Sequence, residues 1–289
     1  MTLDTESYEL EVPGARLGYD VRGDLATGGA PLLLIGSPMG AQGFGSLAGR
    51  FPDRTIVTYD PHGTGRSKRT DGRAETTPED HASDLHHLVE ALGAGPVDLF
   101  GSSGGAVNGL ALVARYPDDV RVLVAHEPPL ADLLPDRVPV LAACEDMHRT
   151  YLEKGFGPAM AKFISFAMRP GPVPTSYADE PAPDPAAFGL PTEDDGSRDD
   201  PLLGQNMRTC TSYVPEYDAL TKVPTRIVVG YGADSGEELA ARAGRATAVR
   251  LGLEPVEFPG GHNGFLGGEF GQQGDPDGFA AVLRQVLAD

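Results

Sequence analysis

Ser103 lies at the centre of Gly101-Ser102-Ser103-Gly104-Gly105, which fits the pattern G-x-S-x-G. The apolar run PVDLF directly precedes this motif, and the helix-like run AVNGLALVARYP directly follows it. A serine on a tight strand-to-helix turn adopts a strained backbone, so the residues two positions away on each side must be small. Its hydroxyl then stands beside unpaired N–H groups of the helix N-terminus, which stabilise a negatively charged oxygen. The motif predicts that Ser103 is the nucleophile of an acyl transfer.

A serine nucleophile requires a general base and an acid that orients the base. Among seven histidines, His262 is the best candidate base because it lies in the glycine-rich segment PGGHNG, just after the last expected strand. Asp234 follows the preceding expected strand, and we predict that it is the acid. Its neighbours, DSGEE, are also typical of a helix start, so a capping role for Asp234 is the alternative.

The elements that must position these residues alternate between strand-like and helical runs, which is typical of a mostly parallel sheet covered by helices. Two runs near the N-terminus, joined by a Pro-Gly turn, predict an antiparallel hairpin. A helix is expected from Thr77 to about Leu92, and another closes the chain from Phe279. Further strands are expected at 31–36, 55–60, 96–101, 120–127, 225–232 and 253–260. The prediction is an α/β protein with about eight strands.

Residues 129–223 interrupt this alternation, because they contain no convincing buried strand. Helices are expected within 139–169 and 202–220, and the segment 171–201 between them holds seven prolines, eight acidic residues and one base. That composition favours an irregular, solvated segment. We therefore expect a core domain made of residues 1–128 and 224–289, and a mostly helical cap or lid domain at 129–223, inserted before the last two strands.

Together these motifs resemble the α/β-hydrolase superfamily over essentially the whole chain. The order Ser103, Asp234, His262 is the order found in that family. The segment YDPHGTGRS at 59–67 resembles the family pattern Y-D-x-R-G-x-G-x-S, with His62 in place of the usual arginine. Ile35-Gly36-Ser37-Pro38 resembles the family turn H-G-x-P, with isoleucine in place of histidine. The resemblance implies an α/β-hydrolase fold with a cap.

The resemblance also implies an oxyanion hole, formed by the backbone N–H groups of Ser37 and Gly104. Pro38 has no N–H group, and Met39 or Gly40 could replace Ser37 if the turn is folded differently. Some members of the family carry the acid one strand earlier, which makes Glu127 the alternative to Asp234. Cap residues such as Met160 and Phe163 are candidates for contact with the substrate.

Composition excludes several other classes of function. The chain has 289 residues, with 23 basic and 42 acidic side chains and a formal net charge of −19. This charge disfavours nucleic-acid or anionic membrane partners. No apolar run reaches the length of a membrane span, and the N-terminus lacks the features of a signal peptide. Cys144 and Cys210 form neither a disulfide framework nor a zinc site. We expect a cytoplasmic protein without metal or cofactor that acts on a small molecule; its oligomeric state is not predicted.

These observations predict a serine hydrolase that cleaves an ester or lactone of a small to medium uncharged molecule. Amides, thioesters and carbon–carbon bonds are cleaved by the same triad, so they stay open. Two alternatives remain. One is a non-hydrolytic enzyme on this fold, of the lyase, cyclase, perhydrolase or haloperoxidase type, and the other is a ligand receptor with slow turnover.

Overall fold

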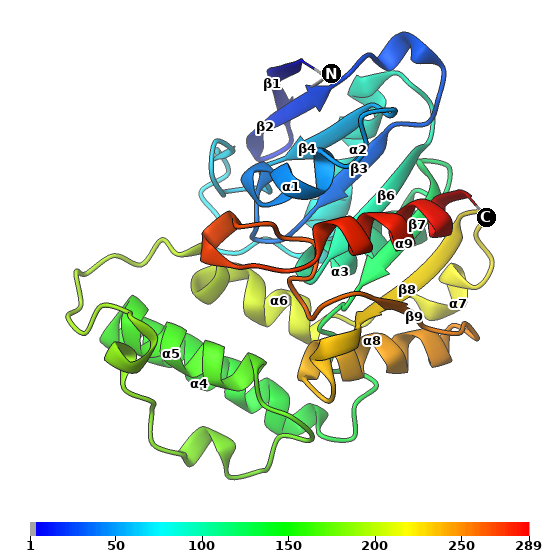
Figure 1. The fold of residues 1–289 in the computed structure, drawn as a ribbon. Coiled ribbons are helices and arrows are strands. Elements are labelled where there is room, and N and C mark those ends of the chain that lie inside the picture. Colours follow the sequence, from blue (N-terminus) through cyan, green and yellow to red (C-terminus); the bar gives the residue numbers. More distant parts are fainter. Residues whose placement is uncertain (1–3, 289) are drawn as a thin grey trace.

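The computed structural model describes residues 4–288, which form a twisted central sheet with helices on both faces (Figure 1). Eight strands of the described chain follow the order β1-β2-β4-β3-β6-β7-β8-β9. The pairs β1–β2 and β2–β4 are antiparallel, and every later pair along this path is parallel. The strands span Thr5–Val12 (β1), Ala15–Arg22 (β2), Leu32–Ile35 (β3), Ile56–Tyr59 (β4), Val97–Ser102 (β6), Val120–His126 (β7), Arg226–Gly232 (β8) and Val256–Phe258 (β9), and the short Lys68–Arg69 (β5) pairs with β2.

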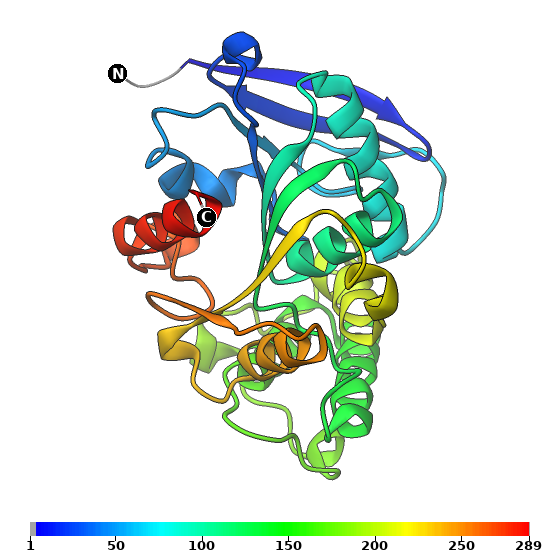
Figure 2. The same ribbon diagram turned by 90° about the vertical axis from the view of Figure 1, so that its right-hand side faces the viewer.

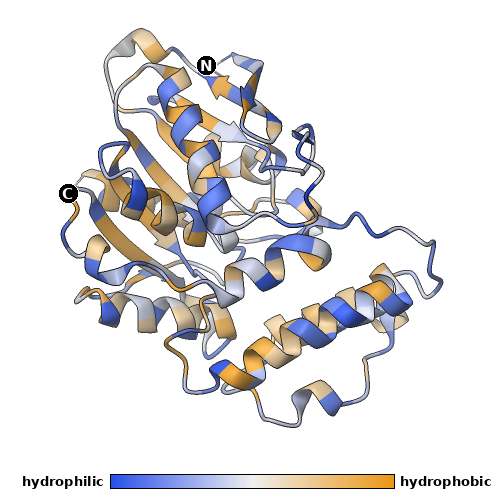
Figure 3. Ribbon diagram, turned by 180° about the vertical axis from the view of Figure 1, so that it is seen from behind, coloured by the Kyte–Doolittle hydropathy of each residue, from blue (hydrophilic) through white to orange (hydrophobic). Residues whose placement is uncertain are grey.

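The alternation of side chains along β3 shows why helices cover both faces of the sheet. Leu33 and Ile35 belong to one apolar cluster and Leu32 and Leu34 to another, because successive side chains of a strand point to opposite faces. The first cluster is covered by α2 (Pro78–Leu92), α3 (Gly104–Arg115) and α8 (Leu239–Arg250). The second is covered by α1 (Gly45–Ala48) and α9 (Pro276–Ala288). Figure 2 shows the sheet between these two layers, and Figure 3 shows its hydrophobic central strands.

Helix α2 begins and ends as its sequence predicts. The Thr77 hydroxyl accepts a hydrogen bond from the Asp80 backbone N–H, and the Asp80 carboxylate accepts one from the Thr77 backbone N–H. Pro78 occupies the first turn, where no backbone donor is needed. The helix ends at Gly93, whose φ of 62° is a left-handed conformation that glycine adopts without strain.

A helical insertion separates β7 from β8, so the expected placement before the last two strands is confirmed. The helical stretch expected at 139–169 consists of two helices, because Gly155, with φ 82°, interrupts it. In the segment 171–201 the structure has no helix or strand other than two 3-10 turns, η3 and η4. The insertion contains α4 (Arg137–Lys154), α5 (Phe156–Ala167), η3 (Tyr177–Asp179), η4 (Pro185–Phe188), a π-helical turn η5 (Leu202–Asn206), α6 (Met207–Ser212) and α7 (Tyr217–Leu220). Four further 3-10 turns are η1 (Leu25–Thr27), η2 (Ala41–Phe44), η6 (Ala233–Ser235) and η7 (Glu269–Gly271).

Five adjacent parallel strands, β3, β6, β7, β8 and β9, end at the same edge of the sheet. The segments that leave this edge carry the candidate residues Ser37, Ser103, Glu127, Asp234 and His262. Ligands of open α/β sheets bind at this carboxyl edge. By length and hydropathy, no helix among residues 4–288 could form a membrane span.

Candidate active site

Ser103 occupies the sharp turn between β6 and α3. Its φ of 57° and ψ of −125° place a non-glycine residue in a strained region of backbone space, which is frequent at active sites. The backbones around it are tightly packed. A Cβ atom on Gly101 would lie 2.7 Å from the carbonyl oxygen of Gly105, and one on Gly105 would lie 2.4 Å from the carbonyl oxygen of Ile35. This close approach explains why the positions two residues before and after Ser103 are glycines.

Gly104 and Ser37, the candidate oxyanion donors, lie next to each other. A Cβ atom on Gly104 would be 2.5 Å from the Ser37 carbonyl oxygen, so the start of α3 and the segment after β3 touch backbone to backbone. As the first residue of α3, Gly104 has an N–H group without an intrahelical acceptor. Both residues line the cavity that Ser103 lines.

His262 forms its polar contact with Glu127. The His262 Nδ1 atom lies 2.5 Å from Glu127 Oε2, and Glu127 Oε1 accepts a hydrogen bond of 2.8 Å from the Gly232 N–H. The Glu127 side chain is completely buried and His262 is partly exposed. Burial alone would raise the pKa of Glu127, but the hydrogen bond and charge of His262 outweigh it and lower the pKa to about 2. Because the carboxylate is ionised, Nδ1 donates to it, which leaves Nε2 as the acceptor nitrogen.

Asp234 lies apart from this pair. It sits in η6 after β8, its side chain is exposed, and within residues 4–288 that side chain makes no hydrogen bond with His262. The structure therefore pairs His262 with the alternative acid of the sequence analysis and not with the first choice. The Asp234 backbone N–H bonds to the Gly260 carbonyl at 2.9 Å, while its side chain is exposed and lines the cavity.

A cavity of about 800 Å³ opens above the sheet edge and is lined by Ser103 and His262. The Ser103 hydroxyl makes no hydrogen bond with His262 among the described residues; such bonds are often long without substrate and shorten in the complex. Phe163 lines the cavity, whereas Met160 packs near Tyr151 inside the insertion. The insertion supplies the apolar wall, which includes Phe163, Ile164, Phe166, Met168, Leu202 and Met207.

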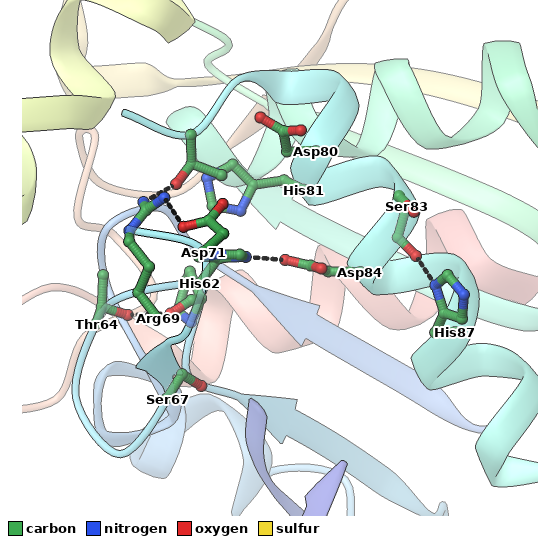
Figure 4. Close-up of polar contacts among 12 residues, drawn as sticks. His62, Thr64, Ser67, Arg69, Asp71, Asp80, His81, Ser83, Asp84 and His87 are labelled. Atoms are coloured by element: carbon green, nitrogen blue, oxygen red, sulfur yellow. Dashed lines mark hydrogen bonds and ion pairs between the residues drawn. The ribbon is translucent and has the colours of Figure 1, made fainter. Parts of the chain in front are cut away.

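The histidines that the sequence places near α2 have structural partners. His62, which replaces the arginine of the family pattern, is buried, and its Nδ1 lies 3.0 Å from Asp84 Oδ2 (Figure 4). His87 Nδ1 donates to the Ser83 carbonyl at 2.6 Å. Among residues 4–288, no group of three or more His, Cys, Asp or Glu side chains has an arrangement that could hold a metal ion. The His62–Asp84 contact joins the loop after β4 to α2, whereas the His87–Ser83 bond lies within α2.

This fold and this arrangement of residues are those of an α/β hydrolase, and the chain belongs to that family. The family model described as "alpha/beta hydrolase fold" matches residues 42–192, just over half of the chain. The "Uncharacterized hydrolase YraK" of Bacillus subtilis (strain 168) is 31% identical over 261 residues, which cover 89% of each protein.

Solved structures agree on the fold. MGS-M2, an α/β hydrolase enzyme from a Medee basin deep-sea metagenome library, superposes with a TM-score of 0.71 at 15% identity and covers 98% of each chain. A thermophilic esterase from Thermogutta terrifontis superposes with a TM-score of 0.67 at 17% identity and again covers 98% of each chain. At this level of identity the likeness concerns the fold alone.

Proposed function

We propose that this protein is a serine hydrolase that cleaves an ester or lactone through an acyl-enzyme, with Ser103 as nucleophile, His262 as base and Glu127 as the acid. The observation that carries the proposal is the 2.5 Å contact between His262 Nδ1 and Glu127 Oε2, beside a cavity that both His262 and the strained Ser103 line. A buried, ionised carboxylate on Nδ1 is what orients a histidine for proton transfer through Nε2.

The reaction proceeds in two halves. His262 Nε2 takes the proton of the Ser103 hydroxyl while its oxygen attacks the carbonyl carbon of the substrate. The resulting oxyanion accepts hydrogen bonds from the backbone N–H groups of Ser37 and Gly104. His262 then gives its proton to the departing alkoxide, and an acyl group stays on Ser103. In the second half, His262 removes a proton from a water molecule that attacks the acyl-enzyme carbonyl. It then gives this proton to the Ser103 oxygen as the bond between that oxygen and the acyl carbon breaks and the acid is released. Glu127 keeps the imidazole in one tautomer and stabilises its charged form throughout.

The charges that line the cavity support a substrate without negative charge. Asp234, Glu238 and Asp275 lie in its wall, and none of the described lining residues is a lysine or arginine. Partial burial, with a smaller contribution from Glu127, raises the pKa of Glu238. An anionic substrate would find no cation to pair with here, so a small to medium uncharged molecule fits the cavity best.

Intact-protein mass spectrometry after exposure to a fluorophosphonate tests this proposal. We expect one adduct on the wild type and on Ser102→Ala, and none on Ser103→Ala. Ser102 is a suitable control because it is the adjacent serine, buried at the end of β6. An adduct on Ser103→Ala, or none on the wild type, would contradict the assignment of the nucleophile.

A further inference from the structure

Asn206, at the end of η5, is a buried residue of the insertion that reaches the sheet edge. Its relative exposure is 1%, and it lines the same cavity as Ser103. No local sequence pattern points to Asn206, because neither a π-helical turn nor the position at which that turn docks has a local signature.

The Asn206 side chain joins three segments of the chain. Its Oδ1 accepts hydrogen bonds from Ser37 Oγ at 3.0 Å and from His81 Nε2 at 3.2 Å, and its Nδ2 donates to the Pro201 carbonyl at 3.0 Å. These partners fix the orientation of the amide, since a flipped side chain would turn its oxygen toward the Pro201 carbonyl. Ser37 belongs to the segment after β3, His81 to α2, and Pro201 to the insertion.

His81 donates its hydrogen bond to Asn206 from a buried ring. Its ring is completely buried, and its Nδ1 atom has no hydrogen-bond partner in the described part of the chain. Burial lowers the pKa of His81 to about 4, so the ring is neutral near pH 7 and carries its proton on Nε2, facing Asn206. Figure 4 shows the His81 side chain extending from α2 toward the loop that carries His62. The ring thus supports the Asn206 side chain through this hydrogen bond.

Ser37 is the residue whose backbone N–H we assign to the oxyanion hole, and the segment around it is held at two points. Asp60 Oδ1 accepts a hydrogen bond of 2.9 Å from the Ala41 N–H, four residues after Ser37. The bond from Ser37 Oγ to Asn206 holds the segment at Ser37 itself. The position of a backbone N–H donor in the oxyanion hole decides how strongly it stabilises the oxyanion. A donor that moves by a fraction of an ångström therefore stabilises the oxyanion less.

We propose that Asn206 is a positioning residue: it fixes Ser37 through the Ser37 hydroxyl, so stabilisation of the oxyanion depends on the insertion being docked. This inference rests on the proposed serine hydrolase function. It assigns Asn206 no contact with the reacting atoms; the residue acts through Ser37.

The test compares Asn206→Ala, Ser37→Ala and the double variant, with Gln205→Ala as the control. Gln205 is the neighbouring residue of the same π-helical turn, and its Oε1 accepts a hydrogen bond of 2.8 Å from Arg69. Gln205→Ala therefore removes a contact between the insertion and the rest of the protein without removing the bond to Ser37. For each variant, kcat and KM are measured with p-nitrophenyl acetate at a temperature where circular dichroism shows it folded. The inhibition constant of benzeneboronic acid, which forms a tetrahedral adduct with serine, is measured alongside.

We expect Asn206→Ala and Ser37→Ala each to lower kcat about tenfold or more, while KM stays within about threefold of the wild-type value. The inhibition constant of benzeneboronic acid should rise by a factor similar to the loss in kcat. The kcat of the double variant should be no lower than that of the less active single variant, because both substitutions remove the same hydrogen bond between Ser37 and Asn206. Gln205→Ala should keep kcat within about twofold.

Three results would overturn the inference: unchanged kcat in Ser37→Ala or Asn206→Ala, additive losses in the double variant, or a loss in Gln205→Ala equal to that of Asn206→Ala. If Asn206→Ala does not fold, Ser37→Ala decides alone, since it keeps the backbone N–H and removes only the hydroxyl. Fluorophosphonate labelling of the wild type separates the two proposals: if it labels Ser103 and these variants retain full kcat, only the inference about Asn206 fails.

Discussion

Glu127 and His262 follow β7 and β9, strands that are not neighbours in the sheet, and their side chains meet across the end of β8. The contact is possible because β8 carries glycine where they cross: Gly232 donates its N–H to Glu127. A Cβ atom on Gly232 would lie 2.7 Å from the backbone of Gly261, in the loop that carries His262. Glutamate, one methylene longer than aspartate, spans this distance from a backbone of positive φ, 50° at Glu127.

Separate removal of the two candidate acids should identify the one that acts. We expect Glu127→Gln to lower kcat by roughly three orders of magnitude, because a neutral amide neither fixes the imidazole tautomer nor stabilises its charge. Asp234→Asn should retain kcat within about threefold, since its carboxylate is exposed and does not contact His262. The measurement is kcat with p-nitrophenyl acetate; a larger loss in Asp234→Asn would reverse the assignment.

Gly104→Ala should damage the oxyanion hole while leaving the nucleophile in place. The added Cβ would lie 2.5 Å from the Ser37 carbonyl oxygen, so one of the two segments must move. We expect kcat to fall at least tenfold. Gly49→Ala is the matched control, because Gly49 has φ −62° and its added Cβ would meet only ordinary contacts of 3.5 Å. Equal activity of the two variants in steady-state assays would argue against a hole built at Gly104.

Buried histidines make the free energy of unfolding sensitive to mild acid. Burial lowers the pKa values of His81 and His126 to about 4, whereas an unfolded chain protonates histidine near pH 6.5. Between these values the unfolded state binds more protons, so stability is full above about pH 6.5 and decreases as the pH falls toward 4. Each histidine contributes a slope of up to about 1.4 kcal/mol per pH unit.

Urea unfolding at pH 7.5, 6 and 5 measures this slope. His126→Leu should reduce it, because both ring nitrogens of His126 are buried without hydrogen-bond partners among the described residues, and the ring packs against Phe258 and Phe279. A stability independent of pH between 7.5 and 5 would show that these rings titrate normally in the folded protein.

The acidic residues that line the cavity should make the enzyme hydrolyse anionic esters less efficiently than neutral ones. We expect kcat/KM for mono-p-nitrophenyl succinate, whose acyl group is anionic, to be at least tenfold below that for p-nitrophenyl butyrate. Glu238→Gln should narrow the ratio, and so should added salt, which screens the repulsion. An anionic ester hydrolysed as fast as the neutral one would show that its acyl group binds away from these carboxylates.

The candidate residues that the sequence indicates most directly are those whose proposed role depends on local pattern. Ser103 was recognisable because strand, glycine turn and helix follow each other within a few residues, and His262 because its loop follows the last strand. The choice between Glu127 and Asp234 depends on which turn faces the histidine after the sheet has formed, which no local pattern encodes. Asn206 is harder still, since it lies 169 residues from Ser37 and meets it only through docking of the insertion.

If the acid is Glu127, which follows β7, the turn after β8 supplies no residue to the triad. Asp234 and Glu238 in that turn still border the cavity, so the charges of these two side chains can change while the Asp234 N–H keeps its bond to Gly260, in the loop that carries His262. Substitutions at these two positions can therefore change the substrate selectivity of the cavity without altering the proposed triad. In a relative whose acid follows β8, the same change would cost activity.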